Sequence, residues 1–245
     1  DAQESRGLGD VYKRQEVICG FGRTGEMFAS GRWNLDPDML LVAKGMTSGY
    51  LPMGAVLAAG RIAEPFWAAP GQMWRHGYTY SGHAAAAAVA HANLDILERE
   101  NLVQAVADKQ MMLNASLAPL REHSYVIDVR AGVGLLGAIQ LDPSLIAADP
   151  TLGARLVRAV REKGVLTRLL ADGGLQVSPP FTITRDDVRL LVAAVDESLG
   201  ELGSQRTMRS GSNIDLLPEQ TRDDSGGFDS LDARLLADVP PHHGS

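Results

Sequence analysis

Three short apolar runs, separated by glycine-rich loops, occur within the first sixty residues. They cover 16–19, 39–43 and 54–59, and each has the length and composition of a buried β-strand. An alanine-rich run then begins after Gly82 and continues to about Glu100. It predicts a long helix whose first two turns, apolar on every side, are buried. This alternation of strands and helices predicts an α/β fold.

The second half of the chain repeats the alternation. Helices are predicted over 102–121 and 151–163, the latter ending at Gly164, and Thr184 is expected to cap a last helix. Four further strands are predicted: a hairpin of 125–130 and 133–141 that turns near Ala131-Gly132, then 165–169 and 175–179 around a turn at 171–174.

The two ends of the chain lack this patterning. Residues 1–15 show neither helical nor strand periodicity, and we interpret them as a leader not native to the rest of the chain or as a frayed terminus. Residues 204–245 are rich in Ser, Gly, Asp, Arg and Pro and are expected to be a disordered tail. Two domains are predicted between the ends, over 16–98 and 99–203.

Composition narrows the class of protein. The 245 residues are 45% hydrophobic and 22% charged, with a formal net charge of −7 and no basic stripe, which argues against binding to nucleic acid or an anionic membrane surface. The single Cys19 excludes an internal disulfide, and we expect a cytoplasmic protein. Three histidines lie close together in the sequence: His76, His83 and His91. No cysteine or carboxylate joins them at the spacing of metal ligands, so no metal is expected.

Lys44 is the residue with the clearest chemical potential. It follows the apolar run 39–43 directly and opens a loop that contains three glycines and a proline. A lysine beside low-dielectric walls loses hydration of its charge, and a neutral amine is what Schiff-base chemistry needs. The alternative is a lysine at a strand end whose ammonium group reaches water.

Five blocks of sequence stand out: EVICGFGRTGEMFAS (16–30), LLVAKGMTSGYLPMGAV (40–56), HGYTYSGHA (76–84), VRAGVGLLGAIQLD (129–142) and LQVSPPFTIT (175–184). Together they resemble the class III pyridoxal-phosphate aminotransferases. The resemblance covers residues 16–203 and corresponds to the C-terminal half of such an enzyme. It implies part of the large domain of a fold-type I transferase (aspartate-aminotransferase-like) and a small α/β C-terminal domain.

The resemblance also implies roles for four residues. Lys44 matches the lysine that forms the Schiff base with pyridoxal phosphate, and Val17 matches the residue that packs on one face of the pyridine ring. Thr79 matches the threonine that binds the cofactor phosphate from the neighbouring subunit of a homodimer. Arg168 matches an arginine that holds the substrate carboxylate, a task suited to a guanidinium fork.

Each of these roles has a purely structural alternative. Val17 would look the same as part of a strand core, Thr79 could help to cap the following helix, and Arg168 could be a solvated strand residue. Arg23 and Thr24, within GRTG, are interpreted as scaffolding of their loop and not as catalytic residues.

One position departs from the family pattern. Gln15 stands where the family has an aspartate that pairs with the protonated pyridine nitrogen, and a neutral amide cannot hold that proton by charge. Glu16 is adjacent, but alternation along a strand should turn it away from Gln15 and Val17. The N-terminal half of the family pattern is also absent, so exposed sheet edges, poor solubility or forced association are expected.

The expected activity is amino-group transfer between an amine or ω-amino acid and a 2-oxo acid, slow or absent in this chain. The loop AKGMTSGYLPMGAV favours this reaction over that of the related aminomutases. The alternatives are a non-catalytic fragment that joins a full-length partner as a pseudo-subunit, and a binding module in which Lys44 is only structural.

Overall fold

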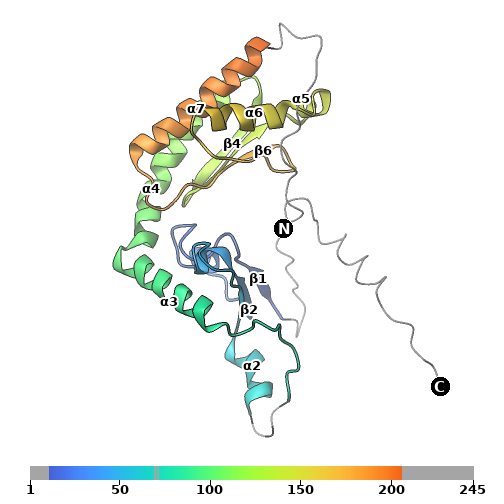
Figure 1. Cartoon of the computed structure of the whole chain (residues 1–245), viewed down its shortest axis with the longest axis vertical. Helices are drawn as coiled ribbons and strands as arrows, with labels where there is room; N and C mark the ends of the chain where they lie inside the picture. The colour runs from blue at the N-terminus through green and yellow to red at the C-terminus, as the bar shows by residue number, and fades with distance from the viewer. Residues whose placement is uncertain (1–10, 69, 71, 206–245) are drawn as a thin grey trace, which may run out of the picture.

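The computed structural model describes residues 11–68, 70 and 72–205, and these form an α/β structure with two sheets. Figure 1 shows the sheets in separate lobes that are joined along one side by two long helices, α3 (Ala84–Arg99) and α4 (Leu102–Leu117). We call residues 11–98 the N-terminal unit and residues 99–205 the C-terminal unit.

The sheet of the N-terminal unit has the order β1-β2-β3. Strand β1 (Lys13–Gln15) runs parallel to β2 (Met39–Val42), and β3 (Ala55–Ala58) runs antiparallel to β2. Short helices connect the strands, α1 (Ala29–Arg32) between β1 and β2 and the 3-10 helix η1 (Lys44–Met46) between β2 and β3, and α2 (Gly60–Trp67) follows β3. Its core is small and consists of Phe21, Val42, Met46, Ala90 and Leu97.

The sheet of the C-terminal unit is an antiparallel meander of β4 (Val126–Val133), β5 (Leu136–Leu141) and β6 (Gly174–Val177). The 3-10 helix η2 (Ala118–Glu122) leads from α4 into β4. The remaining helices are α5 (Pro143–Ala148), α6 (Leu152–Glu162) and α7 (Arg185–Gln205). Leu113, Ile139, Leu156 and Leu199, from α4, β5, α6 and α7, are almost completely buried in one continuous core.

Most of the predicted elements are confirmed within a few residues. Strands β2 and β3 and helices α3, α4, α6 and α7 lie where the pattern places them. Gly164 follows α6 with φ +87°, a left-handed conformation that glycine adopts without strain. Thr184 caps α7, because its hydroxyl accepts a hydrogen bond from the Asp187 amide at 3.2 Å.

The strand predicted over 16–19 is wrong. The first strand is β1, which lies inside the segment expected to be without regular structure, and residues 17–20 form a turn. The Gly20 amide donates to the Glu16 carbonyl at 2.9 Å, and this bond closes the turn and ends the strand. The first ten residues of the predicted leader lie outside the described residues.

The strand predicted over 165–169 is also wrong, since only an isolated bridge joins Leu169 to Leu175 there. The hairpin turn lies at Gly134-Leu135 instead of Ala131-Gly132. Gly132 has φ +99° inside β4, where the pairing with β5 shifts register, so this glycine serves a β-bulge.

Burial in the N-terminal unit is lower than predicted. In β3, Val56 and Leu57 are exposed, and in the first two turns of α3 only Ala86 and Ala90 are buried. One side of β3 and one side of α3 have no packing partner among the described residues. The predicted tail from 206 onward lies outside the described residues, whereas residues 204 and 205 belong to α7.

Candidate functional site

Three residues of interest lie where two parallel strands end. Gln15 is the last residue of β1, Val17 comes two residues later, and Lys44 follows the end of β2. In the pairing of β1 with β2, Gln15 lies opposite Leu41, and Lys44 comes three residues later. Because parallel strands end at the same edge of a sheet, the structure brings the three predicted residues to one edge. Val17 is half-buried and Gln15 is exposed.

Lys44 begins η1, and its side chain is exposed. This exposure agrees with the alternative of a strand-end lysine that reaches water and not with a lysine held between low-dielectric walls. Strand β2 ends at Val42, and Lys44 adopts φ +45°, a left-handed conformation that is uncommon for a residue with a Cβ atom. The surrounding structure must hold this conformation, and strained backbone of this kind is frequent at functional sites.

Asn93 holds the backbone of the Lys44 loop. Its Nδ2 donates to the carbonyls of Gly45 at 2.9 Å and Met46 at 3.1 Å, and its Oδ1 accepts from the Ser48 hydroxyl at 2.6 Å. The sequence prediction missed this residue. The signal was present, because Asn93 is the one polar residue in the buried stripe Ala86, Ala90, Asn93 and Leu97 of α3.

Glu16 is completely buried, whereas Gln15 is exposed and Val17 is half-buried, which agrees with the expectation that Glu16 turns away from both. Its two carboxylate oxygens accept hydrogen bonds from the amides of Ala29 at 2.5 Å and Ser30 at 2.6 Å, at the start of α1. The carboxylate binds the N-terminus of α1, where a negative charge is favourable.

Thr79 lies in the irregular segment between α2 and α3, and its side chain is exposed. It does not cap α3, because the residue at the cap is His83, whose Nδ1 accepts from the Ala86 amide at 3.2 Å. The structural alternative considered for Thr79 is therefore excluded.

Arg168 belongs to the C-terminal unit and is exposed. Its Nε donates to Gln176 Oε1 at 2.6 Å, and its carbonyl accepts from the Gln176 amide at 2.9 Å. It lines a groove of about 710 Å³ whose walls are residues 164–168, residues 175–180 and α7. The Gln176 side chain orients the guanidinium at the mouth of this largely apolar groove.

Three further structural findings concern the described residues. Nowhere in 11–68, 70 and 72–205 do three or more His, Cys, Asp or Glu side chains lie together in a way that could hold a metal ion. Over the same residues, every helix is too short or too polar to cross a membrane. Cys19 is a half-buried free thiol, and burial is the main cause that raises its pKa.

A family model described as "Aminotransferase class-III" matches residues 14–199. The chain belongs to this family. Among relatives, an uncharacterised aminotransferase, YhxA, of Bacillus subtilis is 40% identical over 193 residues, which are 75% of this chain and 43% of that protein. An omega-amino acid–pyruvate aminotransferase of Pseudomonas putida is 39% identical over 194 residues, covering 76% of this chain and 42% of the relative.

Solved structures of similar fold are transaminases. An amine transaminase from an uncultivated Pseudomonas species, in its PLP-bound form, has a TM-score of 0.71 at 40% identity over 79% of this chain and 45% of that one. An (S)-enantioselective omega-transaminase from Thermomicrobium roseum has a TM-score of 0.72 at 37% identity, with 79% and 44% covered. The fold is therefore that of a class III aminotransferase, and this chain spans less than half the length of the relatives it matches.

Proposed function

We propose that this chain is the lysine-bearing part of a pyridoxal-phosphate-dependent transaminase that exchanges an amino group between an amine or ω-amino acid and a 2-oxo acid. The observation that carries the proposal is the position of Lys44. It presents an exposed amine at the carboxyl edge of parallel strands, on a loop whose backbone Asn93 holds.

The residues present fit pyridoxal phosphate in part. When bound, this cofactor supplies an aldehyde for an amine to attack and an aromatic ring that accepts electrons from the substrate. Lys44 offers the amine, and the half-buried Val17 offers an apolar contact for the ring. Gln15 offers a neutral amide at the position of the family's aspartate, so the ring nitrogen would lack an ionic partner in this chain.

The other residues would act on the substrate and on the cofactor phosphate. The Arg168 guanidinium, oriented by Gln176, would bind the substrate carboxylate, and Lys44 Nζ would accept and return a proton. Thr79 would bind the phosphate group of the cofactor held by a neighbouring subunit. Its exposure, together with that of Trp74, Tyr78 and Tyr80 in the same segment, supports a position at a homodimer interface.

Intact mass after incubation with pyridoxal phosphate and borohydride tests the proposal. We expect one adduct per chain, mapped by peptide digestion to Lys44 and lost in Lys44→Ala. The control is Lys13→Ala, which removes an exposed lysine of β1 and should keep the adduct. Equal labelling of all three proteins, scattered over surface lysines, would overturn the proposal.

A second candidate is a non-catalytic pseudo-subunit, favoured by Gln15. Gln15→Asp separates the two. If only the missing carboxylate limits turnover, the variant should raise the rate with an amine and a 2-oxo acid, and the effect of one electrostatic group is about 10²–10³-fold. A variant that labels at Lys44 but gains no activity would favour the pseudo-subunit.

A further inference from the structure

Arg23, in the loop GFGRTG of the N-terminal unit, makes polar contacts with the C-terminal unit. Arg23 Nη1 donates to the carbonyl of Leu135 at 3.2 Å and to that of Pro179 at 2.5 Å. In return, the Leu135 amide donates to the Arg23 carbonyl at 3.1 Å. Arg23 therefore binds two separate segments of the C-terminal unit, the β4–β5 turn and the segment after β6.

Phe181 lies beneath the same guanidinium, with its ring centroid 4.6 Å from Arg23 Cζ. It packs against both hydrophobic clusters, that of the N-terminal unit and that of the C-terminal unit. Its carbonyl accepts from Lys109 Nζ at 2.6 Å, which anchors it to α4. The junction is tight, since a Cβ atom on Gly22 would stand 3.1 Å from the Phe181 ring.

The contacts of Arg23 and Phe181 lie between two of the candidate site residues, Lys44 and Arg168. On one side, Phe21 contacts Gly45, the neighbour of Lys44: a Cβ atom on Gly45 would stand 3.1 Å from that of Phe21. On the other side, Pro179 closely follows Gln176, which orients Arg168. The path from Lys44 to Arg168 therefore runs through Phe21, Arg23 and the segment 176–179.

We propose that Arg23 is a positioning residue that sets the Lys44 loop against the Arg168 segment by joining the two units. The meaning of this for the site residues rests on the proposed function, whereas the joining of the units does not. An arginine suits this task because Nη1 donates to two carbonyls while the planar guanidinium stacks on a ring, a face that a lysine ammonium lacks.

Burial supports the same conclusion. The half-buried guanidinium is partly withdrawn from water, and this burial lowers the pKa of Arg23. The two carbonyls compensate the lost hydration, and charge-assisted hydrogen bonds are stronger than neutral ones. Without the guanidinium both carbonyls lose this partner. The bond from the Leu135 amide to the Arg23 carbonyl, the bond from Arg32 to Gln110 and the apolar contacts of Phe181 would remain, so we expect the units to be held together but less firmly.

Electron–electron double resonance between two spin labels tests the proposal without any cofactor. The labels are placed on exposed alanines, Ala92→Cys of α3 and Ala193→Cys of α7, in a Cys19→Ala background. We expect a narrow distance distribution for the parent, and a broader and shifted one for Arg23→Ala. Arg23→Lys should give an intermediate distribution, and methylguanidinium, but not methylammonium, should narrow that of Arg23→Ala.

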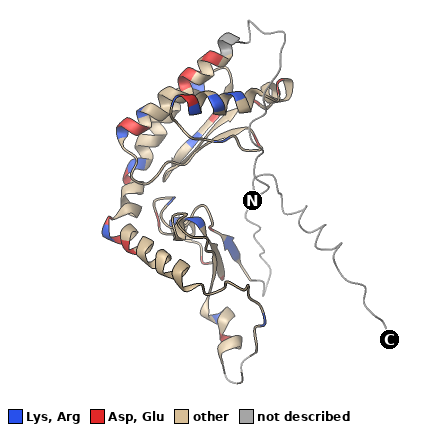
Figure 2. Cartoon of the chain, viewed as in Figure 1, with Lys and Arg blue, Asp and Glu red and all other residues tan. Residues whose placement is uncertain are grey.

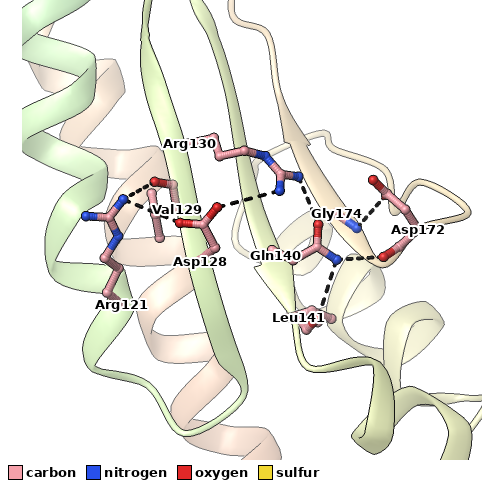
Figure 3. A network of polar contacts seen from close by, with 8 residues as sticks. All are labelled: Arg121, Asp128, Val129, Arg130, Gln140, Leu141, Asp172 and Gly174. Atoms are coloured by element: carbon pink, nitrogen blue, oxygen red, sulfur yellow. Dashed lines mark hydrogen bonds and ion pairs between the residues drawn. The ribbon is translucent and has the colours of Figure 1, made fainter. Parts of the chain in front are cut away.

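The matched control is Arg121→Ala. Arg121 also donates to a backbone carbonyl, that of Val129, but it belongs to a network wholly inside the C-terminal unit (Figure 3). The control should leave the distribution unchanged. If Arg23→Ala does not fold, Phe181→Leu removes the ring beneath the guanidinium and should broaden the distribution. An unchanged distribution in a folded Arg23→Ala, or in Phe181→Leu when Arg23→Ala does not fold, would overturn the proposal, whatever the outcome of the labelling at Lys44.

Discussion

The two units of this chain differ in how completely they bury their apolar side chains. In the C-terminal unit, four helices and a three-stranded antiparallel sheet enclose one core, and charged residues of both signs lie along α6 and α7 (Figure 2). In the N-terminal unit the core is small, and large side chains are left in water: Tyr50 is 80% exposed, Trp67 85% and Tyr78 77%. A monomeric protein seldom exposes so much apolar surface.

The difference separates two of the candidate residues. The unit that closes its own core carries the candidate carboxylate-binding Arg168 at a groove, whereas the unit with exposed apolar faces carries Lys44. These exposed faces occur in a chain that spans less than half the length of its relatives.

Matched truncations in the two cores should give the largest contrast. Leu156→Ala removes a side chain with no exposure from the C-terminal core, and the cost should be about 2–5 kcal/mol of unfolding free energy. Leu40→Ala removes a half-buried side chain of β2 and should cost less than half as much. Urea unfolding followed by circular dichroism measures both, and equal costs would contradict the contrast.

The buried Glu16 carboxylate should be the main polar support of the N-terminal unit. Glu16→Gln keeps one acceptor oxygen for the amides of Ala29 and Ser30 but removes the charge, so we expect a loss of about 1–3 kcal/mol. Glu26→Gln, an exposed change in the same region, is the control and should be neutral. A thermal melt in which both variants match the parent would show that the carboxylate is not a support.

Acid should weaken the C-terminal unit through aspartates at the starts of its helices. Hydrogen bonds from Ser144, Thr151 and Thr184 lower the pKa values of Asp142, Asp149 and Asp187 below the ordinary 3.8. A lowered folded pKa gives stability that is complete above the unfolded value and is lost as pH falls through the folded value.

The urea midpoint should therefore drop as pH decreases below about 4, near the ordinary aspartate pKa. Asp187→Asn should flatten this dependence, while Asp95→Asn, on an exposed position of α3, should leave it as in the parent. A parallel decline in all three proteins would assign the acid sensitivity to other groups.

The smallest effect is expected at the junction of the units. Thr24 is buried, and its hydroxyl has no hydrogen-bond partner within the described residues. Thr24→Val replaces the hydroxyl with a methyl group of similar shape, so stability should be unchanged or rise by up to about 1 kcal/mol. A clear loss in differential scanning calorimetry would mean that the hydroxyl has a partner after all.

Local pattern predicted what is determined locally. The apolar run of β2, the stripe of α3 and the Thr184 cap could each be found from neighbouring residues, and the five motif blocks together led to the family. The apolar run before Lys44 identified it as the residue of chemical interest, and the blocks then gave it a role. Its exposure was expected only under the alternative of a strand-end lysine that reaches water.

Tertiary partners explain the failures. The run 16–19 looks like a strand, but Glu16 bonds to α1 and its carbonyl closes a turn. The run 165–169 is apolar enough for a strand, yet Thr167 satisfies the Gln176 carbonyl with its hydroxyl, at 2.7 Å, where a ladder bond would otherwise form. Asn93 and Arg23 bind groups that are distant in the sequence. The buried stripe of α3 marks Asn93 as unusual, but no local pattern identifies the partners of either residue.

Hydrogen exchange on the whole chain tests the contrast between the units most directly. Amides of β5, between two strands and over the C-terminal core, should exchange only with global unfolding, whereas those of β3, at an edge with exposed side chains, should exchange many times faster. Such a difference would show that the Lys44-bearing unit is not closed by its own core. Equal, slow exchange in both strands would contradict the account.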